Sequence, residues 1–229
     1  MADPDSQWLA KRQRLVNQLT QGSVNDRRLA LNELAESPSD KAVALLQELL
    51  NSPDFSLRKF AVMGLGNHPT DESFATLQAF TAKEKDTTVL AEAANSLYEF
   101  GDRAYPEFRR LYEAHDNWLL RQTIISLAIE SKDPDLMWEF ALLGLDDANQ
   151  LIKEAAIFAF GQLLKGDRNA QAFETLEQTA VDPVWRTRWR TAIALQNGPK
   201  EQVQPLLLKL KSDEHFRVVA AALDVLNVI

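Results

Sequence analysis

Apolar residues recur along the chain at intervals of three and four, the spacing that places them on one face of an α-helix. Four short segments carry this spacing clearly: residues 42–50, 74–80, 136–143 and 203–208. Stop signals separate such segments, for example Asn-His-Pro-Thr-Asp at 67–71 and Ser-Lys-Asp-Pro-Asp at 131–135. There is little sign of a strand, so the sequence predicts helices throughout.

A second pattern marks a further helix after each of these segments. A residue that can cap a helix is followed by a basic residue four positions later, a small residue after three more and a large apolar residue after another four. The clearest copies are Asp54, Arg58, Ala61, Leu65 and Asn149, Lys153, Ala156, Phe160, with Gly66 and Gly161 next in the chain. The small residue lets a neighbouring helix approach, and the apolar residue fills the core from the same face.

Weaker copies extend this pattern over most of the chain. Their cap positions are Ser23, Asp86, Asp116, Val184 (with Asp182 just before it) and Asp213. The small residues fall at 30, 61, 93, 123, 156, 191 and 220, a mean spacing of roughly 31 residues, as in two-helix repeats. We therefore predict an all-α fold, a right-handed α-α superhelix of six to seven helix pairs, with seven of these second, or B, helices.

The segment before Ser23 lies outside the repeats. We expect it to supply an N-terminal capping helix within residues 1–22, followed by repeats over 23–229. No linker interrupts the chain, so a single domain over 1–229 is predicted. The apolar end at 225–229 suggests a surface through which two copies could form a homodimer.

Composition and charge narrow the range of functions. The formal net charge of -8 argues against nucleic-acid binding through phosphate contacts. There are no cysteines and only three widely separated histidines, so no metal site is expected. No signal peptide or apolar stretch of membrane-spanning length is recognised. We expect a cytoplasmic protein with no membrane insertion and no required cofactor.

The repeats resemble the HEAT-like family named for the phycobilisome lyases, whose units read roughly as apolar-Arg-x-x-Ala-x-x-x-Leu-Gly. The best match is Leu-Arg-Lys-Phe-Ala-Val-Met-Gly-Leu-Gly at 57–66, and Trp-Leu-Leu-Arg-Gln at 118–122 is similar to the start of many such units. The resemblance covers the chain from about Ser23 onward. The segments at 118–125 and 185–190 look most like the cyanobacterial branch, which holds bilin lyase subunits and NblB, a lyase homologue implicated in phycobilisome degradation.

This resemblance implies binding to phycobiliprotein subunits, to other phycobilisome-associated proteins, or to their open-chain tetrapyrrole. Phycocyanobilin is then the expected bound ligand. If the protein is an enzyme, the resemblance implies a lyase acting on the thioether between a bilin and a cysteine of the partner. The sequence identifies no catalytic residue.

The segment Trp-Arg-Thr-Arg-Trp-Arg at 185–190 is the most unusual in the chain. On a helix, Trp185 and Trp189 share a face, and so do Arg186 and Arg190. Indoles stack on conjugated rings and guanidinium groups pair with carboxylates, so this surface suits a flat, acidic ligand. The full predicted ligand site consists of Trp118, Arg121, Trp185, Arg186, Arg188, Trp189 and Arg190.

A structural interpretation competes with each of these assignments. Both tryptophans of 185–190, and Trp118, could fill the core. Arg188 could belong to a ladder of basic residues that bridges neighbouring repeats or their caps, together with Arg27, Arg58, Lys153 and Arg217. Asp116 or Asn117 would cap the helix that Trp118 opens, although His115 beside them could shuttle protons.

A second patch is predicted for partner docking. Tyr105, Arg109 and Tyr112 lie in one segment, and Arg109 and Tyr112 are three residues apart, so they could share an exposed face. Ordinary solvated helix surface is the alternative interpretation.

Two other functions stay open at this stage. One is a pure adaptor that binds a protein along the groove of the stack and holds no ligand. The other is an alkylpurine DNA glycosylase, because such enzymes are HEAT-like solenoids of similar length and residues 116–121 look superficially like one of their units. The net negative charge of the chain counts against the glycosylase, because DNA binding relies on basic residues that contact phosphates.

Overall fold

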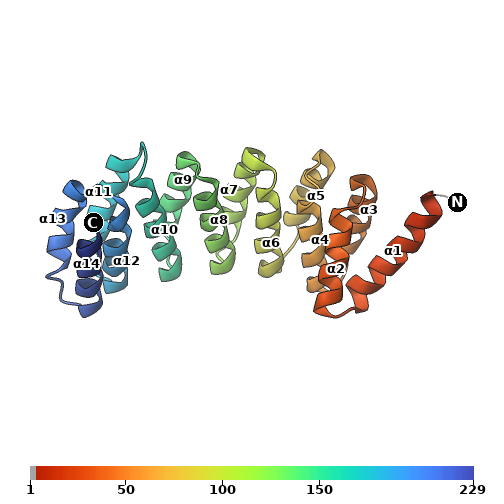
Figure 1. Ribbon diagram of the computed structural model, residues 1–229, viewed down its shortest axis with the longest axis horizontal. Coiled ribbons are helices and arrows are strands. Elements are labelled where there is room, and N and C mark those ends of the chain that lie inside the picture. Colours follow the sequence, from red (N-terminus) through yellow and green to blue (C-terminus); the bar gives the residue numbers. More distant parts are fainter. Residues whose placement is uncertain (1–3) are drawn as a thin grey trace. The chain divides into compact units, whose positions relative to one another are not determined.

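The structure is a computed structural model that describes residues 4–229, and it is built from helices (Figure 1). No strand occurs in this range, which confirms the all-α prediction. The α-helices are α1 (Pro4–Gln21), α2 (Val24–Ala35), α3 (Ser39–Leu49), α4 (Phe55–Gly66), α5 (Asp71–Thr81), α6 (Thr87–Tyr98), α7 (Tyr105–Ala114), α8 (Trp118–Ser131), α9 (Pro134–Leu145), α10 (Gln150–Leu163), α11 (Asn169–Thr179), α12 (Trp185–Ala194), α13 (Lys200–Leu210) and α14 (Phe216–Val228). Two short 3₁₀ helices, η1 (Gly101–Ala104) and η2 (Leu195–Asn197), were not predicted.

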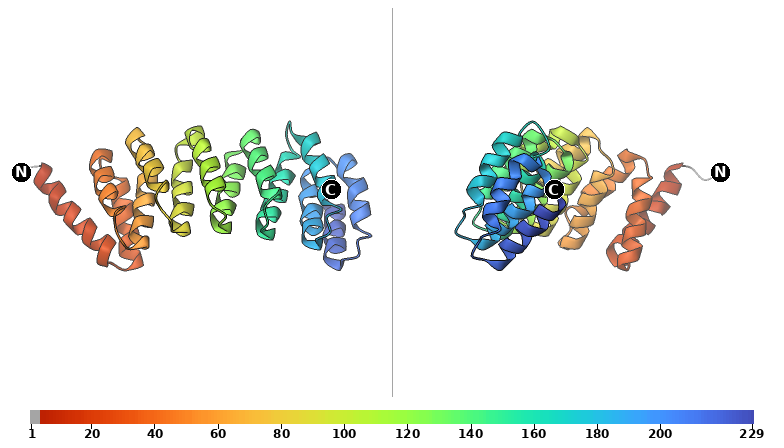
Figure 2. Two further views of the ribbon diagram at one scale, coloured as in Figure 1. Left: turned by 180° about the vertical axis from the view of Figure 1, so that it is seen from behind. Right: turned by 60° about the vertical axis from the view of Figure 1, so that its left-hand side comes forward.

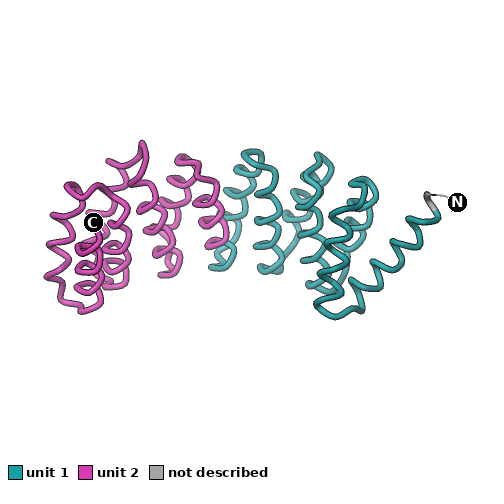
Figure 3. The backbone as a smooth tube through the Cα atoms, viewed as in Figure 1, with its two compact units in different colours: residues 1–120 teal, residues 121–229 magenta. Residues whose placement is uncertain are grey.

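The chain divides into two compact units, residues 1–120 and 121–229, and the boundary falls inside α8 (Figure 3). In each unit, A and B helices alternate along the chain, and Figure 2 gives two further views of these pairs. The predicted B helices correspond to α2, α4, α6, α8, α10, α12 and α14. A single domain over 1–229 stays a prediction.

In the first unit, α1 packs against α2 and α4 and buries Leu15 and Leu19 completely. This matches the helix expected ahead of the repeats. The B helix α4 contacts both α6 and its own A helix α3. The buried residues of these helices are mainly Leu, Val and Ala at helical spacing, which explains why the apolar pattern identified them.

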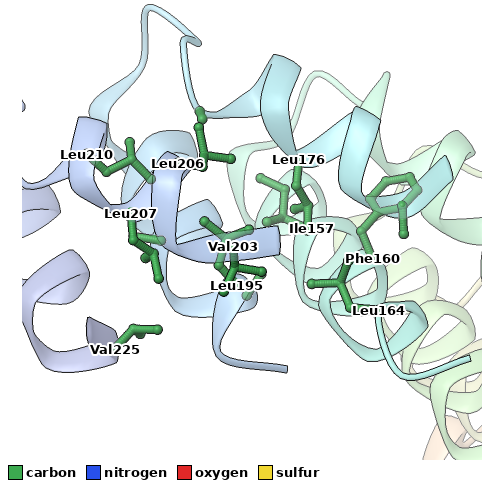
Figure 4. Packing of buried hydrophobic residues seen from close by; sticks show 14 of the residues in the cluster. Ile157, Phe160, Leu164, Leu176, Leu195, Val203, Leu206, Leu207, Leu210 and Val225 are labelled. Atoms are coloured by element: carbon green, nitrogen blue, oxygen red, sulfur yellow. The ribbon is translucent and has the colours of Figure 1, made fainter. Parts of the chain in front are cut away.

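In the second unit, α10 packs against α9 and α12, and α12 packs in turn against α14. The core between them combines apolar side chains of both helix types, as Figure 4 shows for Phe160, Leu176, Leu195 and Val203. The ring of Trp138 meets that of Phe160 edge-on, at 5.4 Å between centroids. Trp185 and Trp189 are partly buried and pack against the edge of this core.

Most of the predicted caps are present. The side chains of Ser23, Asp54, Asp86 and Asn149 accept backbone N–H groups in the first turns of their helices. At α8 the cap is Asn117, whose side chain accepts the amides of Leu119 and Leu120.

The predicted cap Asp213 is wrong. His215 occupies the cap position of α14, and its Nδ1 accepts the amide of Arg217. The Asp213 carboxylate instead binds Arg188 and the amide of His215. The last copy of the pattern therefore starts two residues later than predicted, and its buried small residue is Ala222 instead of the exposed Ala220.

Glycine allows neighbouring B helices to approach each other closely. A Cβ on Gly161 of α10 would lie 2.9 Å from the Cβ, and 3.0 Å from the backbone, of Ala194 in α12. In the first unit, a Cβ on Gly66 of α4 would lie 3.0 Å from the Cβ of Ser96 in α6. The glycine at the end of the repeat pattern thus marks a point where two B helices touch.

Substituting Gly161 with Ala should force α10 and α12 apart, because the added methyl meets backbone atoms that cannot rotate away. We expect a loss of about 1–3 kcal/mol in the free energy of unfolding, the usual cost of overpacking. Urea denaturation followed by circular dichroism measures it. Gly166→Ala is the matched control, since nothing lies within 4 Å of a Cβ there; equal stability losses in the two variants would contradict the close-contact explanation.

Candidate functional site

The basic residues of the repeat pattern form ion pairs with the following repeat. Arg58 of α4 donates from Nε and NH2 to the carboxylate of Glu84, at 2.6 and 3.1 Å. Its NH1 group donates to the carbonyls of Ser52 and Pro53. Burial alone would raise the pKa of Glu84, but the hydrogen bonds from Arg58 and from two backbone amides outweigh this and lower it.

Arg188 of α12 repeats this arrangement in the second unit. Its Nε and NH2 donate to the two oxygens of Asp213 at 2.7 and 2.9 Å, and NH1 donates to the carbonyls of Asp182 and Pro183. Glu214 accepts a further bond at 3.2 Å. The hydrogen bond from Arg188 lowers the pKa of Asp213, against the opposing effect of burial. Arg188 is only 7% exposed.

These contacts confirm the ladder interpretation for Arg58 and Arg188. Arg121, also predicted for the ligand site, pairs with the buried Asp147 at 2.6 Å. Each of these pairs joins a B helix to an acidic residue 25 or 26 positions later, in the turn before the next B helix. They act as a structural framework beneath the exposed surface.

Arg186 and Arg190 lie on the seam between α12 and α10. Arg186 donates to the Glu154 carboxylate at 2.6 Å, and Arg190 donates from Nε to the Glu154 carbonyl at 3.2 Å. The guanidinium of Arg190 also lies over the Phe158 ring, 5.1 Å from its centroid. Burial lowers the pKa of Arg190, although a guanidinium stays protonated in any case. No carboxylate within residues 4–229 forms a hydrogen bond with it.

An aromatic stack joins the beginnings of α12 and α14. Trp185 and His215 are parallel, with centroids 4.0 Å apart and an interplanar angle of 4°. Phe216 continues the stack at 5.0 Å and is 72% exposed. The guanidinium of Arg217 lies over Trp185, 5.4 Å from the ring centroid, a cation–π contact that fixes its position.

A groove of about 370 Å³ runs between α12 and α14. Its apolar lining comes from Trp189 and Ile193 on one side and from Ala220, Ala221, Val225 and Val228 on the other. Arg217 and Asp224 contribute its charged groups, and Gln196 completes it. We call the surface formed by this groove, the Trp185–Phe216 stack and the Arg186–Arg190 seam the Trp–Arg surface.

Arg217 links the two tryptophans of this surface. Its guanidinium lies over the ring of Trp185, and it lines the same groove as Trp189. Sequence reasoning missed His215, Phe216 and Arg217 as members of this site. The available signal was the repeat length, because the residues that begin α14 follow those that begin α12 by about one repeat.

The other predicted site residues lie elsewhere. Trp118 opens α8 and is 45% exposed, which agrees with a surface position and not with a core filler. Tyr105 is partly exposed and its ring is stacked at 6.4 Å on that of Phe108. The expectation that Arg109 and Tyr112 share an exposed face is wrong: Arg109 is exposed, but Tyr112 is only 4% exposed because it faces inward with Phe108 and Leu111.

Neither a metal-binding cluster nor a membrane-spanning helix occurs among the described residues. Residues 4–229 hold no group of three or more His, Asp or Glu side chains placed to bind a metal ion. Within the same range, no helix is both long and apolar enough to cross a membrane.

Paired helices of this length, with a repeated contact between successive B helices, define the class of α-helical repeat proteins. A family model for HEAT repeats matches residues 13–98, 43–128 and 139–227. The chain therefore belongs to the HEAT-repeat family. No curated protein sequence matches it.

Several solved structures share the fold. The Escherichia coli protein YibA is 14% identical, with a TM-score of 0.60 over 96% of this chain and 85% of that one. The karyopherin Kap121p, bound to the extreme C-terminus of the phosphatase Cdc14p, is 15% identical with a TM-score of 0.58; the match covers 99% of this chain and 29% of the karyopherin. A homology model of the full-length AP-3 complex gives 17% identity and a TM-score of 0.61, over 100% of this chain and 46% of that one. Identities this low establish the fold alone.

Removing Arg188 should be strongly destabilising, because it leaves the Asp213 carboxylate almost buried and without its main partner. We expect Arg188→Ala to lose about 3–5 kcal/mol of unfolding free energy, as is usual when one member of a buried pair is deleted. Thermal and urea unfolding measure this loss. Arg186→Ala is the matched control, because its ion pair is more exposed and should cost less than about 1 kcal/mol; a similar cost for both arginines would refute the ladder role.

The same pairs should make stability depend on pH in the acid range. The pKa values of Asp213 and Glu84 are lowered in the folded state. Their contribution to stability is therefore complete when the pH lies above the unfolded-state pKa values of about 4. It is lost as the pH falls through the lowered, folded-state pKa values. We therefore expect the unfolding free energy to decline below about pH 5. The decline should be shallower in Asp213→Asn and unchanged in Asp146→Asn, an exposed control; parallel pH curves for Asp213→Asn and the wild type would contradict this assignment.

Proposed function

We propose that this HEAT-repeat protein binds phycobiliproteins, through the open-chain tetrapyrrole that they carry, at the Trp–Arg surface. The observation that carries the proposal is the groove between α12 and α14, in which the partly exposed Trp189 lies beside the guanidinium of Arg217. The resemblance of the repeats to those of the phycobilisome lyases and NblB supports the choice of ligand.

The chemistry of the surface suits such a ligand. A bilin is a flat conjugated chain that carries two propionate carboxylates. The Trp189 indole offers a face or edge for stacking, and Ile193 and Val225 extend the apolar lining. Arg217 and Arg190 offer guanidinium groups that form no hydrogen bond with a carboxylate in the part of the chain that the structure describes, so both can pair with a propionate.

In this proposal the protein contributes binding and orientation. The ladder pairs beneath the surface hold α12 and α14 in place, and the Trp185–His215 stack fixes where Arg217 points. A rigid surface of this kind holds a chromophore and its carrier protein in one geometry, which serves attachment, detachment or delivery for degradation alike.

A pure adaptor function is the second candidate. Exposed apolar side chains lie in two of these B helices, Leu151 in α10 and Phe216 and Val228 in α14, at 47%, 72% and 75% exposure. Aromatic and aliphatic residues of this kind anchor protein interfaces without any small ligand. A DNA glycosylase gains no such support, since Arg121, Arg186 and Arg188 are paired with carboxylates and phosphate binding needs available cations.

Titration with phycocyanobilin, followed by its visible absorption and by tryptophan fluorescence, should give saturable binding. Trp189→Ala combined with Arg190→Ala should weaken binding at least about tenfold, since stacking and a charged hydrogen bond are each worth about 1 kcal/mol or more. Trp8→Ala combined with Arg28→Ala, the same substitutions in the first unit, is the matched control and should bind normally.

Circular dichroism confirms that each variant is folded. Equal losses in both double variants would exclude the Trp–Arg surface as the bilin site. If free bilin does not bind but purified phycocyanin binds, and Phe216→Ala weakens that binding, the adaptor function replaces the chromophore function.

A further inference from the structure

We infer that the first unit holds a binding site for a small organic phosphate that carries a flat ring, of the mononucleotide class. The site is a pocket lined by the A helices α3 and α5 and by the start of α4, with a volume of about 650 Å³. Pockets of this size are typical of small-molecule sites. The Trp–Arg surface belongs to the second unit, so this inference goes beyond the proposed function and does not rest on it.

Contacts within the protein fix the side chains that line this pocket. Gln47 of α3 donates to the Thr76 hydroxyl of α5 at 2.9 Å and so ties two of the walls together. Arg58 of α4 also lines the pocket, and it is held by the Glu84 carboxylate and by the carbonyls of residues 52 and 53. A pocket with walls fixed in this way loses little conformational freedom when a ligand binds.

The charges of the lining select an anion. Arg58, Lys83 and Lys85 face one carboxylate, that of Glu84, whose two oxygens already accept hydrogen bonds from Arg58 at 2.6 and 3.1 Å. Lys83 and Lys85 are exposed, and neither ammonium has an ion-pair or hydrogen-bond partner within residues 4–229. Two ammonium groups therefore remain for a ligand. A phosphate monoester matches them, because it is close to a dianion at pH 7.

Neutral polar groups of the lining add hydrogen-bond donors. The Ser52 hydroxyl accepts the amide of Asp54 and the Thr76 hydroxyl accepts Gln47, so each keeps its own O–H to donate. Phosphate supplies three strong acceptor oxygens for such donors. The carboxylates of Asp54 and Asp86 are close enough to act on Arg58, but they cap α4 and α6 and lie outside the lining.

An apolar wall lies in the same pocket as these donors. Leu50, Ala79 and the half-buried ring of Phe80 form it. The amide of Lys83 donates to the Phe80 carbonyl at 3.0 Å, so the ring and one of the two unpaired ammonium groups belong to a single turn of the chain. Aromatic rings pack favourably against the face or edge of another ring. The pocket therefore suits a ligand with a flat group attached to its phosphate.

Adenosine monophosphate is a suitable probe, because it combines a flat base with a phosphate monoester. Isothermal titration of the full chain should show saturable binding of this nucleotide. Adenosine lacks the phosphate and ribose 5-phosphate lacks the base, so each should bind at least about tenfold more weakly. In ¹⁵N NMR, the nucleotide should shift the backbone amide signals of residues 50–52 and 80–85.

Variants of the protein give the second arm of the test. Lys83→Gln combined with Lys85→Gln should weaken binding of the nucleotide at least about tenfold and leave adenosine unaffected, since only contacts with the phosphate are lost. Lys209→Gln combined with Lys211→Gln is the matched control, because these exposed lysines have the same spacing at the end of another A helix, α13. Phe80→Leu should weaken the nucleotide and adenosine by a similar factor.

Three results would each overturn the inference: no saturable binding of the nucleotide, equal affinities for the nucleotide and adenosine, or unchanged affinity in the Lys83 and Lys85 double variant. Equal affinities for the nucleotide and ribose 5-phosphate would overturn it as well, because the ring would then make no contact. The variant with Trp189→Ala and Arg190→Ala should bind the nucleotide like the wild type, and no bilin enters this experiment. Failure of the phosphate site and failure of the chromophore function are therefore distinguishable.

Discussion

Neighbouring B helices in this protein approach so closely that single side-chain atoms decide whether they fit. Gly161 leaves room for the backbone of Ala194, and Gly66 leaves room for Ser96. This contact keeps the turn before each B helix within reach of the basic residue one repeat earlier, so the Arg58–Glu84 and Arg188–Asp213 pairs can form. The packing, the ladder and the placement of the surface residues all depend on it.

The ladder in turn determines which cations remain for binding. Arg121, Arg186 and Arg188 are each neutralised by a carboxylate of another helix or turn. Losing one member of a buried pair such as Arg188–Asp213 destabilises the fold, because the other charge is left buried and unpaired. Arg190 and Arg217 keep donors free of carboxylates in the described part of the chain, and both are held against aromatic rings.

Local features of the fold could be predicted from the sequence, because helix spacing and capping depend on residues a few positions apart. Ser23, Asp54, Asp86 and Asn149 cap their helices as predicted. Asp213 could not be assigned correctly, since Arg188 of the previous repeat competes for its carboxylate. Tyr112 was misplaced for a related reason: spacing alone does not say which face of α7 points inward.

The candidate site could be predicted only on its α12 side. Trp185, Arg186, Trp189 and Arg190 stand together in the sequence, and their composition identified them. Their partners His215, Phe216 and Arg217 come from the next repeat, about one repeat length away, and nothing local marks them as neighbours of a tryptophan. The repeat length is the signal that could find them, since Phe216 begins α14 as Trp185 begins α12.

The pairing of the ladder arginines explains how a chain of net charge -8 can offer a site for anions. Acidic residues are spread along the turns and caps, where they stabilise helix starts and hold the ladder arginines. The charge that matters to a ligand is the charge left unpaired within a few ångströms of the groove, because screening removes the effect of distant groups. At the Arg217 end of that groove the remaining charge is positive, and the adjacent Trp189 makes it selective for an anion with an apolar or conjugated body.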